Sequence, residues 1–455
     1  SGLSTAWWLA HQGIAVEVWE ARELPGGKIR TTQEGGYLTE RAAGLLVNFR
    51  DEIDQMIIEA GLGDERRERP NELNRYVIHE GRLTKIPMLL PKLLASPLWS
   101  LPAKLRLMGE IAIPRGTQPD ESVSSFIRRR LGQEVLDTAI DPFVTGTLAS
   151  DPDKAEARSV LPRLTTLEQR YGSLTLGMLI NRILKRRRAN KADTFSFGGG
   201  MSQLIQAVSD HSNITLRCGV AVKTVLKEHE QWLVQGCDRQ GQLQRTVPHV
   251  VVSTPAYISA GLVQGIDERL SKLLSEIEYA PVAVLHLGMS RSAIQHPLDG
   301  TGFLASRQCG LAFNGNLWMS RLFPERAPLG HTLLTSYLGG AHRPEQIELS
   351  DRKLSDTLLE GLTPLLGIKG EPDYFRIDRH FRGLPLYHGA YQARMEQIDT
   401  RLGQHPGLYL NANYRDGVSL RERIYQGKCL ADRIVAKLAV EQPEKAIDLR
   451  LAPAR

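Results

Sequence analysis

Cysteine is scarce in this chain of 455 residues: four are present, Cys218, Cys237, Cys309 and Cys429, and no two form a C-x-x-C pair. Such spacing is typical of a reducing compartment and argues against a zinc or iron–sulfur centre, so no metal is expected. Long apolar runs are also lacking, because none approaches the roughly 18 residues that a membrane-spanning helix needs. We therefore expect a cytoplasmic protein that touches the inner face of the cell membrane only peripherally.

Aromatic residues are few as well. They make up 6% of the chain, and hardly any stand among the basic runs at 66–67, 128–130 and 185–188. Surfaces that bind nucleic acid usually combine basic and aromatic side chains, so nucleic acid is not an expected partner. With a net charge of +6, the basic runs are typical of solvated helix faces, and an anionic membrane surface or an acidic ligand is the functional alternative.

The chain also lacks a recognisable catalytic triad. Its 12 histidines are scattered, and none stands with a serine or a cysteine in a pattern typical of nucleophilic catalysis. No catalytic side chain is therefore expected. This absence suits an enzyme in which a bound cofactor performs the chemistry and the protein supplies position and electrostatics.

Strands and helices alternate in three separated parts of the chain: the start, the region after residue 191 and the end. Between them lie a helix-rich region and a set of further strands. This texture predicts an α/β fold in which a discontinuous Rossmann-like nucleotide-binding domain carries an inserted mixed-sheet domain and an inserted helical domain. Ser1 to Ala10 are expected to form an amphipathic helix, with Leu3, Ala6, Trp7 and Ala10 on its apolar face.

Gly2 and Glu20 match the second half of a dinucleotide-binding fingerprint. In that fingerprint a glycine-rich turn opens a helix beside a pyrophosphate, and an acid at the end of the next strand binds ribose hydroxyls. Gly2 would be the third glycine, and Glu20 would be the acid after the strand that begins near Ile14. An ordinary packing glycine at a helix start is the alternative for Gly2 alone.

The residues after Glu20 extend this signal. The segment VEVWEARELPGGKIRT resembles the flavoprotein amine-oxidase superfamily, whose FAD site continues past the acid into a double glycine and a base. The resemblance implies that FAD is the cofactor and that Glu20 holds the adenosine ribose. The further cofactor-binding residues that it implies are Arg22, Gly26, Gly27, Lys28, Val222, Asn413, Gly417, Val418 and Ser419.

The fingerprint begins at its helix, with no strand before Gly2. We expect an intact copy of the unit to carry one more strand and two more glycines. We accordingly expect the 455 residues alone to bind FAD weakly or not at all.

Later segments narrow the resemblance. ESVSSFIRRRLGQEVLDTAIDPFVTGTLASDPDKAEARSVLPRLTTLEQRYGSL, FSFGGGMSQL, PLDGTGFL, LFPERAP, LLTSYLGGAHRPE and GLYLNANYRDGVSL resemble, in order, the oxygen-dependent porphyrinogen oxidases of haem synthesis. The resemblance implies oxidation of protoporphyrinogen IX or coproporphyrinogen III in three hydride transfers to flavin N5, with O2 reoxidising the flavin and leaving H2O2. An amine oxidase, a carotenoid-type desaturase and a non-catalytic tetrapyrrole-binding protein are the alternatives.

The same resemblance implies four substrate-binding residues. Arg75 would grip a carboxylate, Phe323 would stack on a pyrrole ring, Leu304 would form an apolar wall, and Gly146 would let the backbone approach the macrocycle. The alternatives are a solvated arginine, a core leucine and a turn glycine. A second copy of the chain counts among the candidate partners.

The expected domains follow from the alternation of strands and helices along the chain and from the resemblance. The FAD-binding domain would comprise 1–70, 191–275 and 386–455, the substrate domain 71–84 and 276–385, and the helical domain 85–190. Apolar residues of the proline-rich stretch from Lys85 to Ile113 are candidates for membrane contact, flanked by Lys92 and Lys104, although packing inside the helical domain is the alternative. They are Met88, Leu89, Leu90, Leu93, Leu98 and Trp99.

Overall fold

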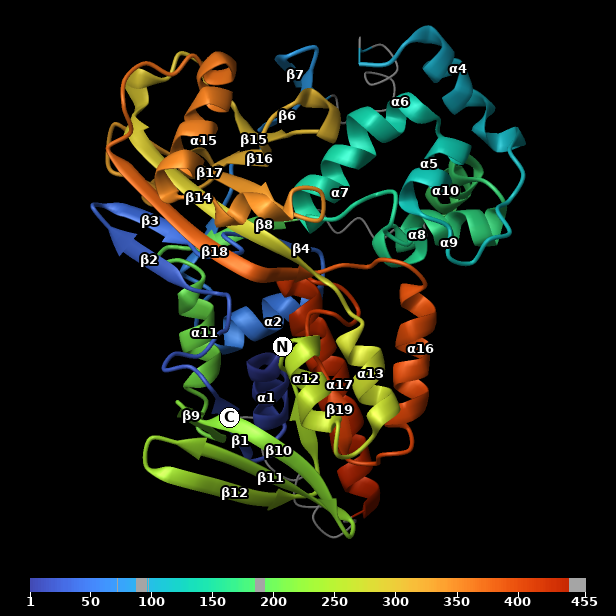
Figure 1. Ribbon diagram of the computed structural model, residues 1–455, viewed down its shortest axis with the longest axis vertical. Helices are drawn as coiled ribbons and strands as arrows, with labels where there is room; N and C mark the ends of the chain where they lie inside the picture. The colour runs from blue at the N-terminus through green and yellow to red at the C-terminus, as the bar shows by residue number, and fades with distance from the viewer. Residues whose placement is uncertain (72, 87–95, 97, 185–192, 442–455) are drawn as a thin grey trace.

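The computed structural model describes residues 1–71, 73–86, 96, 98–184 and 193–441. Its elements form a lower part, above which a large mixed sheet lies beside a group of helices (Figure 1). The α/β class expected from the sequence is confirmed. The expected residues Met88 to Leu90, Lys92 and Leu93 and the basic run 185–188 lie outside the described residues.

The lower part brings together the start, middle and end of the chain. Its parallel strands form two pairs, β1 (Val16–Glu20) with β9 (Ile214–Cys218), and β13 (Val250–Val252) with β19 (Leu408–Leu410). Around them lie α1 (Gly2–His11), α2 (Asp51–Glu59), α11 (Ser202–Ser209), α12 (Ala256–Val263), α13 (Glu268–Ser275), α16 (Tyr391–Leu402) and α17 (Leu420–Glu441). An antiparallel meander of β10 (Ala221–Glu228), β11 (Gln231–Asp238) and β12 (Gly241–Val247) closes the lower end.

Seven strands form the upper sheet in the order β18-β14-β17-β16-β15-β6-β7. Neighbours are antiparallel except β15 and β6, which are parallel. The strands are β6 (Asn74–His79), β7 (Arg82–Lys85), β14 (Tyr279–Ser290), β15 (Gly300–Leu304), β16 (Phe313–Trp318), β17 (His331–Gly339) and β18 (Tyr374–Pro385), and α15 (Asp351–Leu366) covers one face.

Short strands connect the two parts. β2 (Thr31–Glu34) pairs with β3 (Tyr37–Glu40), while β8 (Asp193–Phe197) lies between β4 (Leu46–Asn48) and β5 (Arg66–Glu68). The segment 319–326 contributes α14 (Met319–Leu322) and a turn of 3-10 helix at Pro324–Arg326.

The helical group holds α4 (Leu101–Met108), η1 (Gly109–Ala112), α5 (Val123–Arg130), α6 (Gln133–Val135), η2 (Leu136–Ile140), α7 (Asp141–Leu148), α8 (Ala157–Val160), α9 (Pro162–Tyr171) and α10 (Leu174–Ile183). Gly172 separates α9 from α10 because it adopts a left-handed φ of 76°. Ser173 then caps α10 by accepting a hydrogen bond from the Leu176 amide at 3.1 Å.

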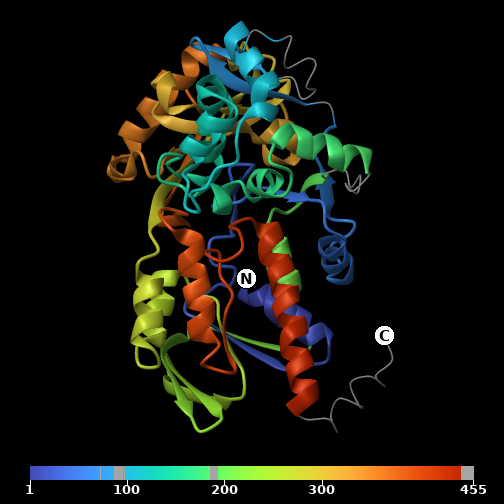
Figure 2. The ribbon, with the colours of Figure 1, turned by 90° about the vertical axis from the view of Figure 1, so that its right-hand side faces the viewer.

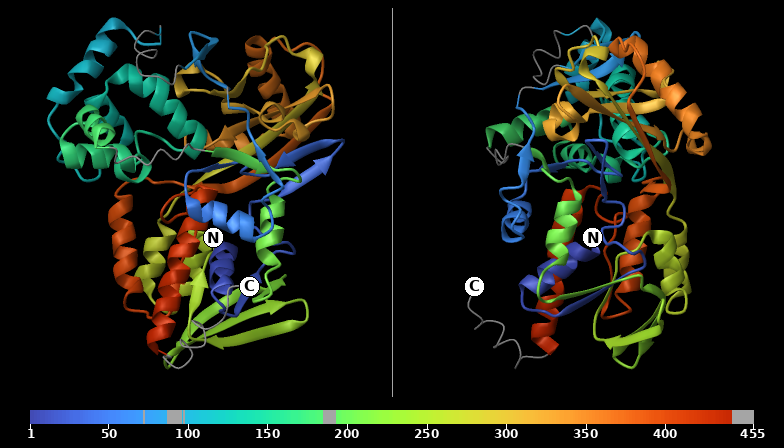
Figure 3. Two further views of the ribbon diagram at one scale, coloured as in Figure 1. Left: turned by 180° about the vertical axis from the view of Figure 1, so that it is seen from behind. Right: turned by 90° about the vertical axis from the view of Figure 1, so that its left-hand side faces the viewer.

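The expectation that the first helix is amphipathic is wrong. Residues Ser4 to Ala10 of α1 are all buried, because α17 and α11 pack against it (Figures 2 and 3). Its polar residues are satisfied internally: Ser4 donates to the Ile424 carbonyl at 3.2 Å. A Cβ at Gly427 would come within 2.4 Å of the Ser4 hydroxyl, so this glycine allows α17 to approach α1 closely.

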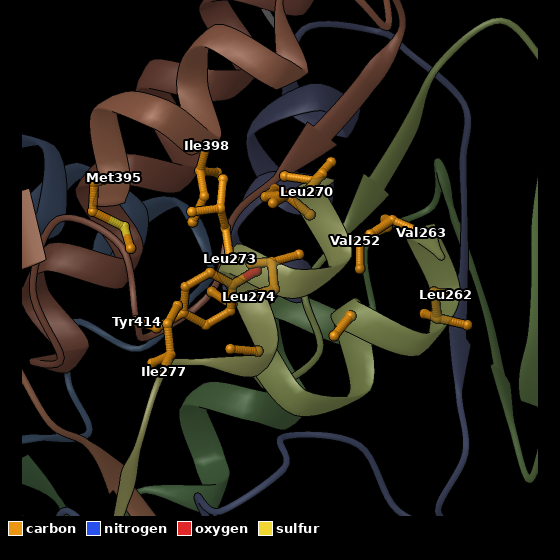
Figure 4. Close-up of a cluster of buried hydrophobic side chains, with 14 of the residues drawn as sticks. Val252, Leu262, Val263, Leu270, Leu273, Leu274, Ile277, Met395, Ile398 and Tyr414 are labelled. Atoms are coloured by element: carbon orange, nitrogen blue, oxygen red, sulfur yellow. The ribbon is translucent and has the colours of Figure 1, made fainter. Parts of the chain in front are cut away.

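Below the sheet, α12, α13 and α16 enclose an apolar core. Figure 4 shows Leu270, Leu273 and Leu274 of α13 gathered with Ile398 of α16 and the ring of Tyr414. Burial of this core holds the segments around residues 250–275 and 386–414 together, and so fixes the loop that follows β19.

Candidate functional site

The predicted cofactor residues lie at the carboxyl ends of the parallel strands. β1 ends at Glu20, and the chain then turns so that the Val220 amide donates to the Glu20 carbonyl at 2.9 Å. Because α1 runs back along β1, its first residue, Gly2, lies at the same end. A Cβ at Gly2 would stand 3.1 Å from that of Ser253, just past β13. Open α/β sheets bind ligands at this edge.

The loop after Glu20 is held by its own side chains. Glu20 accepts the Arg22 amide at 3.0 Å, and the Arg22 guanidinium donates to the Gly27 carbonyl at 3.0 Å. Gly26 has a φ of 98°, and a Cβ there would lie 2.9 Å from Ile205. Gly26 is therefore needed for both backbone conformation and close packing, while Gly27 is favoured by its φ of 65° alone.

Lys28 reaches from this loop to the upper sheet. Its ammonium donates to the Arg382 carbonyl at 2.8 Å and to the Gly383 carbonyl, and it lies 5.8 Å from the ring centre of Tyr279. Burial, together with the positive charge of Arg22, lowers the pKa of Lys28 to about 8. A partly buried cation thus stands between the two parts of the molecule.

The loop between β19 and α17 carries Asn413, Gly417, Val418 and Ser419. Gly417 has a φ of 102°, which favours glycine, and Ser419 accepts the Glu422 amide at 3.3 Å. Val222, at the start of β10, and Val418 both pack against the apolar core below the sheet. The structure therefore places the predicted cofactor residues around one strand edge.

Buried polar atoms without partners test whether this edge suits an FAD molecule. In the described residues, the Ser253 hydroxyl, the Tyr387 hydroxyl and the Arg423 Nε are buried with no hydrogen-bond partner. Native proteins rarely leave such groups unsatisfied, and a dinucleotide offers phosphate and hydroxyl partners. Together with the close approach at Gly2 and the turns at Gly26 and Gly417, these residues fit FAD.

Strand register aligns Leu304 with a row of residues across the upper sheet. Leu304 faces Val77 on one side and Gly315 on the other, and Gly315 in turn faces Tyr337. Directly paired residues present their side chains on the same face. Leu304 and Tyr337 therefore share one face of the sheet.

Gly146 of α7 packs against this row of residues. A Cβ there would come within 2.7 Å of a Leu304 methyl group and 3.0 Å of the Asn314 carbonyl oxygen. The structure thus brings the predicted Gly146 and Leu304 into contact, at the junction of the helical group and the sheet.

Arg75 lies two residues before Val77 on β6, so it shares that face. Its side chain reaches solvent, although surrounding protein and the positive charge of Arg69 lower the pKa of its guanidinium. Phe323 is placed differently. Its ring is 2% exposed, inside an apolar cluster with Tyr37 and Met319, so the structure does not bring it to the row of Leu304.

A buried ionic network, which the sequence analysis did not single out, lies between β3 and the same sheet face. Glu40 pairs with Arg326 at 2.6 Å and accepts the Met201 amide at 2.8 Å. Burial raises the pKa of Glu40 despite the opposing charge of Arg326, and burial lowers the pKa of nearby His286 to about 4. The partner Arg326 had a local signal, the LFPERAP segment, but its pairing joins residues 286 apart.

A small cavity of about 10 Å³ adjoins this network. Its lining comprises Leu38, Thr39, Glu40, Ala42, Gly44, His286, Met319, Leu333, Thr335 and Tyr337. The segment after Glu40 therefore faces the same side of the sheet as Tyr337 and Leu304. A larger groove of about 460 Å³ lies between α1, α2 and α11 and is lined by none of the predicted site residues.

Across the ranges that the structure covers, no group of three or more His, Cys, Asp or Glu side chains is arranged to hold a metal ion. No helix among these residues is long and apolar enough to span a membrane. All four cysteines are free thiols.

Comparison with known proteins extends these findings. The sequence profile of a family described as flavin containing amine oxidoreductase matches residues 1–427. Protoporphyrinogen oxidase 2, chloroplastic/mitochondrial, of Arabidopsis thaliana is 28% identical, with 96% of this chain and 92% of the relative covered. Coproporphyrinogen III oxidase of Bacillus subtilis is 28% identical, with 90% and 89% covered.

A solved structure from Exiguobacterium sp. 255-15 has the same fold, with a TM-score of 0.78 and 22% identity over 95% of this chain and 96% of that chain. The sequence profile spans nearly the whole chain, including every segment that meets at the strand edge. The chain therefore belongs to the family of flavin containing amine oxidoreductases.

Proposed function

We propose that this protein oxidises a porphyrinogen, either protoporphyrinogen IX or coproporphyrinogen III, to the porphyrin in haem synthesis. The relatives named protoporphyrinogen oxidase and coproporphyrinogen III oxidase support this assignment, since they align over most of the chain. Bound FAD would supply the hydride acceptor, O2 would be the final acceptor, and H2O2 the by-product.

In this proposal Glu20 holds the adenosine ribose, and Gly2 with the loop 413–419 surrounds the pyrophosphate and ribityl chain. Gly26, Gly27 and Lys28 line the flavin pocket, with Arg22 holding their loop in place. The backbone of Val222 lies beside the adenine. These roles agree with a strand edge at which all these segments meet.

One observation carries the substrate assignment: Arg75, Leu304 and Gly146 gather at one face of the upper sheet. An apolar wall with an arginine at its edge suits a wide macrocycle with carboxylate arms. Leu304 and Gly146 would exclude water from the ring, while Arg75 would orient a carboxylate. Phe323 would act on the ring only if the cluster around it opened.

The experiment is a side-by-side turnover assay. The purified chain, supplied with FAD, is incubated in air with each porphyrinogen, and porphyrin fluorescence, O2 consumption and H2O2 are followed. We expect enzyme-dependent porphyrin formation with stoichiometric peroxide. Porphyrin binding without any turnover would contradict the enzyme and favour a carrier, and turnover of an amine alone would favour an amine oxidase.

Peripheral membrane contact is part of the proposal. Two of the residues predicted for it, Leu98 and Trp99, are buried in the helical core and are excluded. Other large apolar residues of the same region are more than half exposed, on α4, η1 and α10: Leu101, Leu105, Met108, Ile111, Met178, Leu179 and Ile183. Since η1 contacts α10, this apolar surface is a better candidate for membrane contact. Cytoplasmic location and a homodimer stay predictions.

A further inference from the structure

Arg423, in the first turns of α17, is a buried cation that pairs with no acidic side chain in the part of the protein that the structure describes. The residue is 4% exposed. Its guanidinium donates to Asn411 Oδ1 at 3.1 Å, to the Ala412 carbonyl at 2.7 Å and to the Arg415 carbonyl. All three acceptors are neutral, and Nε has no partner.

No carboxylate of the described residues forms an ion pair with Arg423. The nearest acid in sequence, Glu422, is engaged elsewhere, by Arg50 at 3.0 Å and Arg421 at 2.9 Å. The charges of Glu422 and Asp416 act on Arg423 only at longer range, and burial lowers its pKa. An uncompensated charge inside a protein is costly, which points to an anion that completes the site.

The surroundings of Arg423 suit an anion. Asn411 accepts from Arg423 through Oδ1 and donates through Nδ2 to Thr5 in the first turn of α1 at 2.8 Å. The N-termini of α1, a helix of 10 residues, and α17, one of 22, therefore lie close to the same guanidinium. Both helix dipoles present their positive ends there. The unpartnered hydroxyl of buried Tyr387 is a further donor that the charge of Arg423 reaches.

We propose that Arg423 binds the pyrophosphate group of the cofactor, donating its free Nε–H and neutralising phosphate charge between the ends of α1 and α17. The inference rests on the proposed role of Gly2 and the loop 413–419. It adds a positioning residue that the glycine-based fingerprint does not contain. The alternative is that Arg423 only stabilises the turn 411–415 through its hydrogen bonds to Asn411 Oδ1 and to the backbone carbonyls of Ala412 and Arg415.

The test compares Arg423→Gln and Arg423→Lys with the matched control Arg421→Gln. Arg421 lies two residues earlier on α17. Arg421 already has a carboxylate partner, so its loss removes no anion site. Affinity for FAD is measured by quenching of flavin fluorescence, and affinity for inorganic pyrophosphate by calorimetry at two salt concentrations. Circular dichroism and thermal unfolding report the fold of each variant.

We expect Arg423→Gln to weaken both FAD and pyrophosphate binding by about 10- to 100-fold, as for a lost hydrogen bond to a charged group. Arg423→Lys should recover part of the lost affinity. The affinity of Arg423→Gln for pyrophosphate should change less between the two salt concentrations than that of the original chain. Arg421→Gln should match the original chain.

Equal affinities in the original chain and in both Arg423 variants, with only their melting temperatures lowered, would show a purely structural role and overturn the inference. If Arg423→Gln does not fold, the Lys variant decides: unchanged pyrophosphate affinity and salt dependence refute the proposal. All chains are compared at FAD and pyrophosphate concentrations high enough to reveal the weak binding expected of these 455 residues. If the original chain then binds neither ligand, the proposed cofactor site falls along with the inference. FAD binding that ignores Arg423 removes the inference alone.

Discussion

At the scale of single residues, Gly146 is the position where a small substitution tests the proposed substrate site most directly. A methyl group there would meet Leu304 at 2.7 Å and the Asn314 backbone oxygen at 3.0 Å. The leucine side chain can move, but the backbone cannot. We expect Gly146→Ala to raise the KM for porphyrinogen about 10-fold, a cost of roughly 1.4 kcal/mol, while FAD affinity stays unchanged.

Steady-state kinetics with each porphyrinogen measure this effect. Gly261→Ala in α12 is the control, because a Cβ at Gly261 would meet nothing within 4 Å. Equal KM values for Gly146→Ala and the original chain would remove Gly146 from the substrate site.

The pair of Glu40 and Arg326 is a second residue-scale feature. Both side chains are almost fully buried, at 3% and 2% exposure, and their oxygen and nitrogen are 2.6 Å apart. Arg326→Met would leave the carboxylate without its cation. We expect it to lower the free energy of unfolding by about 3–5 kcal/mol, measured by urea denaturation.

The double variant Glu40→Leu with Arg326→Met is the comparison for that loss. Removing both charges should be less harmful than removing Arg326 alone. A single variant as stable as the original chain would mean that the pair contributes little.

At the scale of elements, Asp267 joins α13 to α16. It caps α13 by accepting the Leu270 amide at 2.9 Å and pairs with Arg401 at 2.7 Å and with His405 at 3.0 Å. Although burial acts in the opposite direction, these partners lower the pKa of Asp267 to about 2. The junction of the two helices is therefore stabilised by an ionised carboxylate.

The pH dependence of stability should reveal this junction. Because the pKa of Asp267 is lower in the folded than in the unfolded chain, its contribution is present above about pH 4 and disappears as pH falls toward 2. Asp267→Asn should reduce the free energy of unfolding by about 2 kcal/mol at pH 7 and flatten the acid limb of the stability curve. A variant that keeps the full acid limb would contradict this account. Denaturant titrations across this pH range measure the effect.

Some elements were predictable from local pattern and others were not. The strand ending at Glu20, the glycine turn before α11 and the final helix all follow from short-range periodicity and turn residues. The burial of Ser4 to Ala10 in α1 did not follow, because its polar Ser4 and Thr5 are satisfied by residues more than 400 positions away. Periodicity along one helix carries no information about how many neighbours will enclose it.

At the scale of the whole molecule, the apolar surface of α4, η1 and α10 gives a prediction. Replacing Leu105, Met108 and Met178 together with glutamate should remove binding to vesicles that contain anionic lipid, as measured by flotation. These side chains are more than half exposed, so the melting temperature should stay close to that of the original chain. Undiminished flotation would assign any membrane contact to another surface.

Local spacing and turn residues are enough to predict Gly2, Glu20, Gly26 and Gly27 as nucleotide-binding residues, because such a motif places its glycines and its acid close together in the chain. The sequence also indicated the α/β class and the family. The contacts between distant segments show that Leu304 meets Gly146 and that Phe323 is enclosed. They also show that the buried Arg423 donates to neutral oxygens and pairs with no carboxylate of the described residues. The physical reason is that strand register and helix packing join distant segments through burial of apolar surface, and these long-range contacts leave little trace in the sequence around any one residue.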